Sequence, residues 1–258
     1  MAGVAGCVAL VTGAGSAEGI GFATAKLLRA GGAKVAITST TERIYKRLQE
    51  LGGDPGETFA HVADLTNATM VAELVAAVTE ALGSIDIVIN NAGMVQIGRD
   101  EPSVHLYEMS EESWHYGMDI NLTSTFLVTR AVLPDMMKRK YGRIVQISSV
   151  TGPIVGIPGS SVYGAAKAGQ LGMTRALALE AGPHNVTVNC IGPGWIQTAS
   201  SDKAEIVAGC YTPVGRPGTA TEVGHVAVFL ASKEASYVTG QLIVVDGGNT
   251  IQEYKVAM

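Results

Sequence analysis

A tyrosine and a lysine stand four residues apart in the segment Tyr163-Gly-Ala-Ala-Lys167. On a helix this spacing places the phenol and the ammonium group on one face. A tyrosine phenol titrates near roughly pH 10 and is a poor acid–base group at neutral pH. A neighbouring cation stabilises the phenolate and lowers that pKa. The pair therefore indicates general acid–base chemistry, although the same spacing is also typical of an ordinary pair on a helix surface.

A second candidate site lies near the N-terminus, where an apolar run leads into Thr12-Gly-Ala-Gly-Ser-Ala-Glu-Gly-Ile-Gly21. A strand, a glycine-rich turn and a helix N-terminus together bind anions through backbone N–H groups and the helix dipole. The common GxGxxG pattern is not met, because Glu18 occupies its third glycine position. The segment predicts a phosphate-binding turn, and an ordinary strand-to-helix turn is the alternative.

The end of the second expected strand bears on which dinucleotide such a turn would hold. A carboxylate at this place binds the ribose hydroxyls of NAD and repels a 2′-phosphate. Here Ser39 and Thr40 follow the strand and Arg43 lies close behind, so that a phosphate has room, hydroxyl donors and a cation. We therefore expect NADP(H) to be favoured over NAD(H), while Glu18 argues the other way if it lies near the adenosine ribose.

The elements that must position these residues alternate along the whole chain. Short apolar runs predict strands at 7–11, 34–38, 58–62, 85–89, 143–147, 186–191 and 241–245. Helical periodicity or composition predicts helices at 20–30, 41–51, 67–82, 110–138, 160–181 and 221–231. Continuously apolar strands are typical of a parallel sheet covered on both faces. The alternation predicts a doubly wound α/β fold, and no linker divides residues 1–258 into two domains.

Composition excludes several classes of protein. The 258 residues include 18 Lys and Arg against 23 Asp and Glu, which gives no electrostatic reason to expect nucleic acid or an acidic membrane as partner. The 32 glycines follow no period, so we attribute them to tight turns and close backbone approaches. No apolar run is long enough for a membrane span. Cys7, Cys190 and Cys210 show no metal or redox spacing, which favours a cytoplasmic protein.

The ordered set of motifs resembles the short-chain dehydrogenase/reductase family over nearly the whole chain. These motifs are Thr12-Gly13 with Gly19-Ile20-Gly21, Asp64-Leu65, Asn90-Asn-Ala-Gly93, Asn121, Ser148-Ser149, Tyr163 with Lys167, Pro193-Gly194 and Asp246-Gly-Gly248. The resemblance implies a Rossmann-type three-layer sandwich with a seven-stranded parallel sheet.

The resemblance also implies a role for each matching residue. Asn121, Ser149, Tyr163 and Lys167 correspond to the family's catalytic tetrad. Ser149 would bind the substrate oxygen, Tyr163 would transfer a proton, Lys167 would hold the nicotinamide ribose, and Asn121 would help to place a relay water. The expected cofactor contacts are Gly13, Gly15, Ser16, Gly19, Ile20, Gly21, Ser39, Thr40, Arg43, Asp64, Leu65, Asn90, Asn91, Ala92, Gly93, Tyr163, Lys167, Pro193, Gly194, Ile196 and Thr198.

One departure from the family pattern bears on the expected reaction. Five residues separate Gly13 from Gly19 where three are usual, and the enoyl-reductase relatives show a similar lengthening. Those relatives space the tyrosine and lysine more widely, so Tyr163 and Lys167 favour carbonyl and alcohol chemistry over C=C reduction. The expected function is an NAD(P)(H)-dependent oxidoreductase of a ketone and secondary alcohol. The alternatives are a 3-oxoacyl-carrier-protein reductase and, more remotely, a non-catalytic, redox-sensing dinucleotide-binding protein.

The expected substrate pocket is mostly apolar and has no fixed basic anchor. Its expected walls are Met94, Val95 and Gln96, residues 151–157 with Thr151 and Val155, and Trp195, under a mobile lid at about residues 199–217. A neutral ketone or secondary alcohol fits such walls. The family resemblance implies a homotetramer.

Two further groups of polar residues carry weaker signals. One group is Lys138, Arg139 and Lys140, which we interpret as the solvent-exposed end of a helix. The alternative is that these residues bind an acyl-carrier protein. The five histidines, His61, His105, His115, His184 and His225, show no metal spacing, and no metal is expected.

Overall fold

The computed structural model describes residues 3–93 and 102–253. Seven strands form one parallel sheet in the order β3-β2-β1-β4-β5-β6-β9. They are β1 (Val8–Val11), β2 (Lys34–Ser39), β3 (Thr58–Val62), β4 (Ile87–Asn90), β5 (Gly142–Ile147), β6 (Val186–Pro193) and β9 (Leu242–Val245). The order reverses between β1 and β4, so the crevice at the carboxyl ends of these strands is a ligand-binding place. The predicted seven-stranded doubly wound sheet is confirmed.

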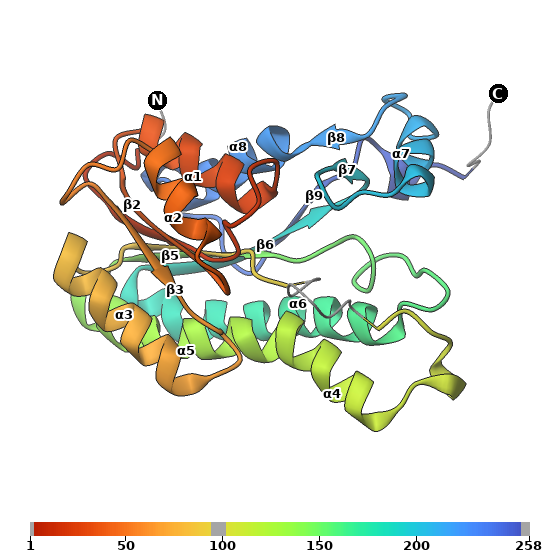
Figure 1. Cartoon of the computed structure of the whole chain (residues 1–258), viewed down its shortest axis with the longest axis horizontal. Helices are drawn as coiled ribbons and strands as arrows, with labels where there is room; N and C mark the ends of the chain where they lie inside the picture. The colour runs from red at the N-terminus through yellow and green to blue at the C-terminus, as the bar shows by residue number, and fades with distance from the viewer. Residues whose placement is uncertain (1–2, 94–101, 254–258) are drawn as a thin grey trace.

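Helices cover both faces of this sheet (Figure 1). One layer contains α1 (Ile20–Ala30), α2 (Arg43–Glu50) and α8 (Ala220–Ala231), and the other contains α3 (Ala68–Leu82), α4 (Glu111–Met118), α5 (Ser124–Arg139) and α6 (Ser161–Ala181). Short 3₁₀ turns lie at Leu106–Glu108, Gly182–His184, Lys233–Ala235 and Asn249–Ile251.

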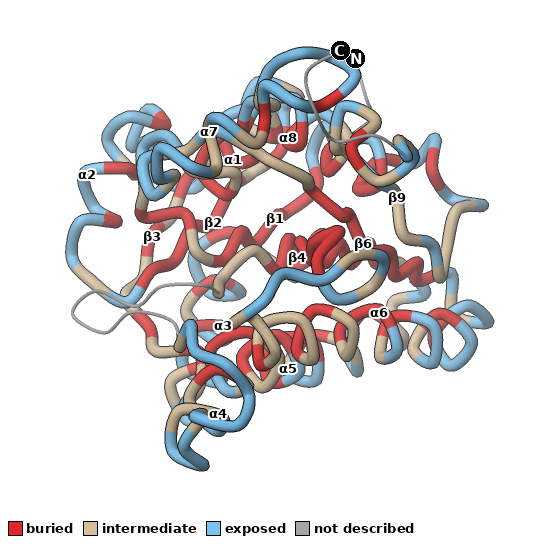
Figure 2. Tube along the Cα trace, turned by 90° about the vertical axis from the view of Figure 1, so that its right-hand side faces the viewer, coloured by how far each residue is buried: buried red, intermediate tan, exposed pale blue. Residues whose placement is uncertain are grey.

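Two apolar cores result from the alternation of side chains along each strand. On β1, Ala9 and Val11 face the core shared with α1 and α8, while Val8 and Leu10 face the core shared with α3 and α5. Figure 2 shows the central strands as a buried layer between half-exposed helices, with the edge strand β9 less buried. Burial on both faces explains why the strands are apolar without alternation in sequence.

The prediction of one continuous helix at 110–138 is wrong, because the helix is interrupted near its middle. The structure divides it into α4, a π-helical turn at Asp119–Thr123, and α5. The Ser124 N–H bonds the Asp119 carbonyl five residues back, where an α-helix would bond four back. Apolar spacing cannot distinguish these two hydrogen-bond patterns over one turn.

The other predicted bounds differ by a few residues. The helix expected at 41–51 begins only at Arg43, because Ser39 Oγ donates to the Thr41 carbonyl and holds a turn there. The strand expected at 85–89 begins at Ile87, because the Asp86 carboxylate accepts from the Val8 N–H and from Arg139.

The segment expected to be a lid contains regular structure. Helix α7 (Lys203–Cys210) lies in it, and the two-stranded pair β7 (Ile196–Gln197) and β8 (Gly218–Thr219) closes its base. Asp202 and Glu205 form a reciprocal capping box at the start of α7, and Thr219 and Glu222 form another at the start of α8. The segment therefore folds on local hydrogen bonds at the carboxyl edge of the sheet (Figure 1).

Candidate active site

Helix α6 carries Tyr163 and Lys167 along the face that meets the sheet. The Lys167 ammonium lies 5.5 Å from the centre of the Tyr163 ring, and its Nζ donates to the Ile147 carbonyl at 3.0 Å. Lys167 is 3% exposed, so its charge acts on its neighbours with little screening by water. The structure thus brings the expected acid–base pair together and fixes the cation beside the phenol's ring.

The two serines after β5 have different surroundings. Ser148 Oγ donates to the Lys167 carbonyl at 2.9 Å and so supports the backbone of α6. Ser149 Oγ accepts from the Thr151 N–H at 3.0 Å and lines a cavity together with Tyr163. Because that oxygen is the acceptor, the hydroxyl proton of Ser149 can be donated elsewhere. Ser149 is thus the serine that lines the cavity with a hydroxyl proton available for donation.

Asn121 lies on the π-helical turn. Its Nδ2 donates to the Gly117 carbonyl at 3.0 Å. A Cβ placed on Gly93 would lie 2.7 Å from Asn121 Oδ1 and 3.6 Å from Lys167 Nζ, so these two groups meet at the end of β4. The structure therefore brings Ser149, Tyr163 and Lys167 to one cavity and places Asn121 near Lys167.

The glycine-rich turn between β1 and α1 is held against the end of β4. Gly13 has φ +66°, and a Cβ there would lie 2.8 Å from the Ala92 backbone. Asn91 Nδ2 donates to the carbonyls of Thr12 and Gly13, both at 3.1 Å. These contacts turn the backbone sharply under the N-terminus of α1.

The N-terminus of α1 fits the phosphates of a dinucleotide. Its N-cap, Gly19, supplies no side-chain cap, and no acidic residue lies in the first turn. Unpaired N–H groups and the positive end of the helix dipole therefore face an anion with no carboxylate in the first turn, while Glu18 lies directly before the N-cap. Ser16, Ile20 and Gly21 complete this turn.

Ser39 and Arg43 lie against the same turn. A Cβ on Gly15 would lie 2.5 Å from Arg43 Nε and 2.9 Å from Ser39 Cβ, which places a guanidinium and a hydroxyl at its edge. Thr40 is exposed beside them, and Glu18 is exposed on the turn itself. The end of β2 thus presents a cation and the exposed Thr40 hydroxyl to a phosphate, whereas the Ser39 hydroxyl donates to the Thr41 carbonyl.

The remaining expected cofactor residues fall into two groups. Seven of them line the cavity that contains Tyr163: Ile20, Asn91, Gly93, Pro193, Gly194, Ile196 and Thr198. The others lie outside this cavity. Among these, Leu65 is buried after β3, and Ala92 packs against the glycine turn. Asp64 Oδ1 accepts from the N–H and the hydroxyl of Thr66 and so forms a turn at the end of β3. Asn90 Nδ2 donates to Thr129 on α5, so this side chain points into the helix layer.

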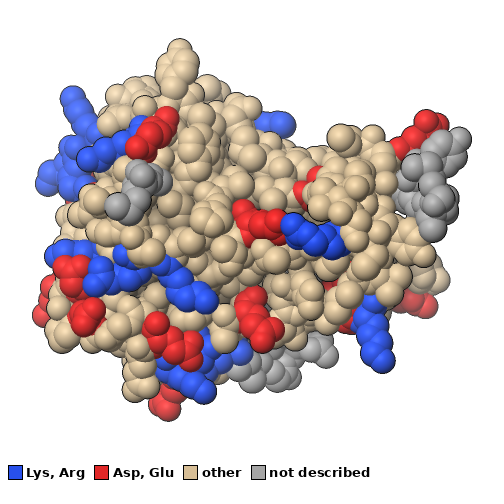
Figure 3. Space-filling view, turned by 90° about the horizontal axis from the view of Figure 1, so that it is seen from above, with Lys and Arg blue, Asp and Glu red and all other residues tan. Residues whose placement is uncertain are grey.

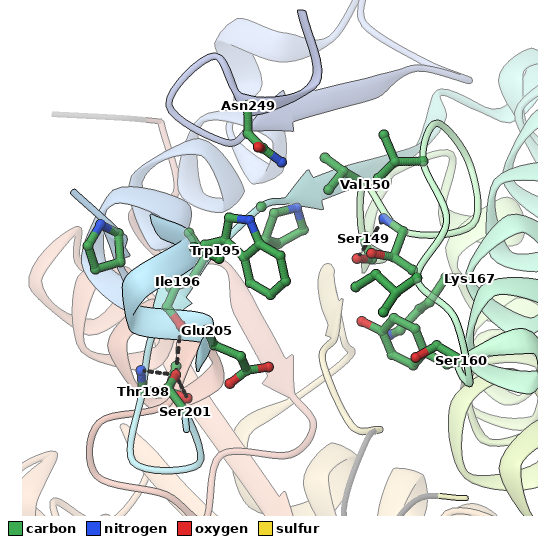
Figure 4. A pocket seen from close by; sticks show the side chains of 18 of the residues that line it. Ser149, Val150, Ser160, Lys167, Trp195, Ile196, Thr198, Ser201, Glu205 and Asn249 are labelled. Atoms are coloured by element: carbon green, nitrogen blue, oxygen red, sulfur yellow. Dashed lines mark hydrogen bonds between the residues drawn. The ribbon is translucent and has the colours of Figure 1, made fainter. Parts of the chain in front are cut away.

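A cavity of about 720 Å³ opens in front of the tetrad. Figure 4 shows Ser149, Ser160 and Lys167 on one side and Trp195, Ile196 and Glu205 on the other. Thr151, Val155 and Trp195, the expected substrate contacts, all line it. Met94, Val95 and Gln96 lie outside the described residues. The volume is sufficient for a small molecule beside a nicotinamide.

Several lining residues were not singled out from the sequence. Glu205 and Ile206 on α7 and Tyr211 after it belong to the expected lid at 199–217, whereas Asn249 and Gln252 lie in a segment for which no cavity contact was expected. The spacing Asp202-x-x-Glu205 is a capping-box signal that could have located α7.

The buried cysteine nearest to the site is not a nucleophile. Burial raises the pKa of Cys190 to about 11, and its Sγ lies 3.1 Å from Thr174 Oγ1. The thiol is therefore protonated at neutral pH. Among residues 3–93 and 102–253, no group of three or more His, Cys, Asp or Glu is placed to hold a metal ion.

Comparison with known proteins agrees with this geometry. A family model described as enoyl-(acyl carrier protein) reductase matches residues 13–250. The 3-oxoacyl-[acyl-carrier-protein] reductase FabG of Vibrio cholerae is 41% identical over 247 residues, which cover 94% of this chain and 97% of the relative. Oxidoreductase UcpA of Salmonella typhimurium is 39% identical over 260 residues, 96% of each protein. A solved structure described as a short chain dehydrogenase/reductase family protein superimposes with TM-score 0.85 at 32% identity, over 96% of this chain and 99% of that one.

Proposed function

Because the chain belongs to the short-chain dehydrogenase/reductase family, whose members are oxidoreductases acting on CH–OH and C=O groups, we propose that it interconverts a small neutral ketone and its secondary alcohol with NADP(H). The observation that carries this proposal is the shared cavity of Ser149, Tyr163 and Lys167. The Tyr163-to-Lys167 spacing favours carbonyl over C=C chemistry, although the matching family model is described as an enoyl reductase.

Ser149 orients the substrate in this proposal. Its oxygen accepts from the Thr151 N–H at 3.0 Å, which leaves its proton available for the substrate's carbonyl or hydroxyl oxygen. A hydrogen bond fixed in this way costs no reorganisation during the reaction.

Tyr163 transfers the proton. During reduction the phenol donates its proton to the substrate oxygen, and during oxidation the phenolate takes it back. The Lys167 ammonium stabilises the phenolate through its charge, and Asn121 beside it helps to place the water through which the proton is exchanged with solvent.

The cofactor residues are a proposal from the same arrangement. The α1 N-terminus with Gly13, Gly15, Ser16, Gly19 and Gly21 would hold the pyrophosphate, and Ser39, Thr40 and Arg43 the adenosine 2′-phosphate. Asp64, Leu65, Asn90, Asn91 and Ala92 would line the adenosine end, and Gly93, Pro193, Gly194, Ile196 and Thr198 the nicotinamide end. When bound, the nicotinamide supplies or accepts the hydride.

The lid and the substrate contacts complete the proposal. Residues 199–217 would close over a substrate that touches Thr151, Val155 and Trp195, and closure would exclude water from the proton transfer. A 3-oxoacyl-carrier-protein reductase is the second candidate, supported by the name of the 41% identical relative. A non-catalytic dinucleotide-binding protein would not require the tetrad Asn121, Ser149, Tyr163 and Lys167, so their presence argues against this alternative.

Partners and location follow as further proposals. The family acts on small molecules, and we expect a homotetramer in the cytoplasm. Figure 3 shows Lys and Arg interspersed with Asp and Glu on the face it presents, so this face offers no continuous basic surface to nucleic acid. None of the described helices is long and apolar enough to cross a bilayer.

A steady-state screen of ketones and alcohols with both cofactors tests the proposal. Tyr163→Phe should abolish turnover and leave NADPH binding nearly intact, because only the hydroxyl is removed. Tyr237→Phe, at a fully exposed tyrosine, is the matched control and should behave as wild type. Undiminished turnover by Tyr163→Phe would refute the mechanism.

A further inference from the structure

A buried glutamine lies on the catalytic stripe of α6. Tyr163, Lys167 and Gln170 are spaced four and then three residues apart, which places them on one face of the helix. Gln170 is 0% exposed. Its side chain therefore lies wholly inside the protein, one turn beyond Lys167.

The Gln170 amide bonds the π-helical turn that carries Asn121. Nε2 donates to the Asn121 carbonyl at 2.7 Å and lies 3.1 Å from Thr125 Oγ1. A π-helical turn shifts backbone donors out of their usual register, so its carbonyls can be served by side chains. Ser124 Oγ does the same for the Ile120 carbonyl at 2.9 Å.

The other end of the amide shows which bond determines its orientation. Gln170 Oε1 is buried and has no hydrogen-bond partner among the described residues. An unpaired buried acceptor costs about 1–3 kcal/mol. Rotating the amide would point Oε1 at the Asn121 carbonyl, which can only accept. The observed orientation is thus the one that keeps the bond to Asn121.

From these contacts we infer that Gln170 is a positioning residue, which holds Asn121 at the right distance from Lys167 for proton exchange. This inference rests on the proposed function, and it adds a second link between α6 and the π-helical turn. Without the amide donor the Asn121 carbonyl loses its 2.7 Å bond and keeps the longer one from Thr125 Oγ1 at 3.4 Å, so that Asn121 shifts relative to Lys167 while the cavity walls and the glycine turn stay in place.

Two apolar substitutions test the inference. Gln170→Met and Gln170→Leu remove the donor and also the unpaired oxygen, so the melting temperature should change little. We expect kcat to fall about tenfold, since small misplacements of catalytic groups have effects of that size. We expect KM and the Kd for NADPH to stay within twofold of wild type, and the solvent deuterium isotope effect on kcat to increase because proton transfer becomes slower.

Gln146→Met is the matched control. Gln146 on β5 is also 0% exposed with an unpaired Oε1, but its amide contacts Thr129 and does not touch Asn121. This variant should keep the wild-type kcat and isotope effect. Three results would overturn the positioning role. They are equal losses of kcat in the Gln146 and Gln170 variants, an unchanged kcat in a folded Gln170 variant, and failure of both Gln170 variants to fold.

Hydrogen exchange separates this inference from the proposed function. In Gln170→Met, amides in residues 117–126 should exchange faster than in wild type, and in Gln146→Met they should not. An inactive wild-type enzyme would refute the proposed function and leave this measurement to decide on Gln170. Unchanged exchange would refute the inference even in an active enzyme.

Discussion

Gly13→Ala tests how closely the glycine turn must approach the end of β4. Gly13 has φ +66°, and a new Cβ would lie 2.8 Å from both Cα and N of Ala92. Neither neighbour can rotate away, because both are backbone atoms. Gly6 is the matched control, since it has φ +76° but a Cβ there would meet nothing within 4 Å.

The two substitutions differ in the clash alone. A positive φ costs an alanine about 1 kcal/mol net in either place, after the smaller entropy of its unfolded chain is counted. Overpacking at Gly13 adds about 2 kcal/mol. For a chain of this size we expect Gly6→Ala to lower Tm by about 3 °C and Gly13→Ala by about 9 °C.

Thermal denaturation and NADPH titration measure both consequences. Gly13→Ala should also weaken NADPH binding at least tenfold, because Asn91 can no longer hold both turn carbonyls at 3.1 Å. Gly6→Ala should bind as wild type. Equal Tm losses in the two variants would show that the approach to Ala92 is not rigid and would refute the reasoning.

Two further perturbations address the cofactor and the dependence of stability on pH. Ser39→Asp should shift cofactor preference, measured as the ratio of kcat/KM values, from NADPH toward NADH. A carboxylate beside Gly15 would repel a 2′-phosphate and accept hydrogen bonds from ribose hydroxyls. An unchanged ratio in steady-state assays would contradict the role given to the end of β2. Hydrogen bonds from Arg216 and from the Thr219 backbone lower the pKa of Glu222 to about 2 from 4.5, so its ionised form stabilises the fold above pH 4.5 and loses this effect as pH falls toward 2. The Tm difference between wild type and Glu222→Gln should therefore shrink over that interval in melting curves, and a constant difference would argue against the linkage.

The fold was predictable because its signals are local and repeated. The sheet strands are continuous apolar runs separated by helical patterns, so all seven could be placed to within a few residues. The alternation of strands and helices predicts a parallel sheet, whereas the strand order and register come from the structure. The two strands β7 and β8 are two residues each and leave no periodicity to detect.

The site was predictable where spacing carries chemistry and not where hydrogen bonding does. Tyr163 and Lys167 are separated by one helical turn, and the structure places them together. The π-helical turn under Asn121 has an ordinary apolar pattern, so only coordinates distinguish it. Asn90 is expected to contact the cofactor from motif order, and only the structure shows that its side-chain amide donates to Thr129.

The hydrogen bonds of the segment over the cavity have a consequence for protein engineering. The capping box of α7 joins Asp202 to Glu205, and Arg216 bonds only Glu222 and the Pro217 carbonyl among the described residues. These contacts stay between residues 202 and 222, while the Val214 N–H donates to the Gly247 carbonyl and Gln252 Nε2 donates to the Tyr211 carbonyl. The segment therefore folds largely on local hydrogen bonds and is attached to the rest of the protein at a few points. Exchanging it for the equivalent segment of a relative should transplant substrate preference with little effect on the sheet, which makes this part of the chain the natural one to diversify.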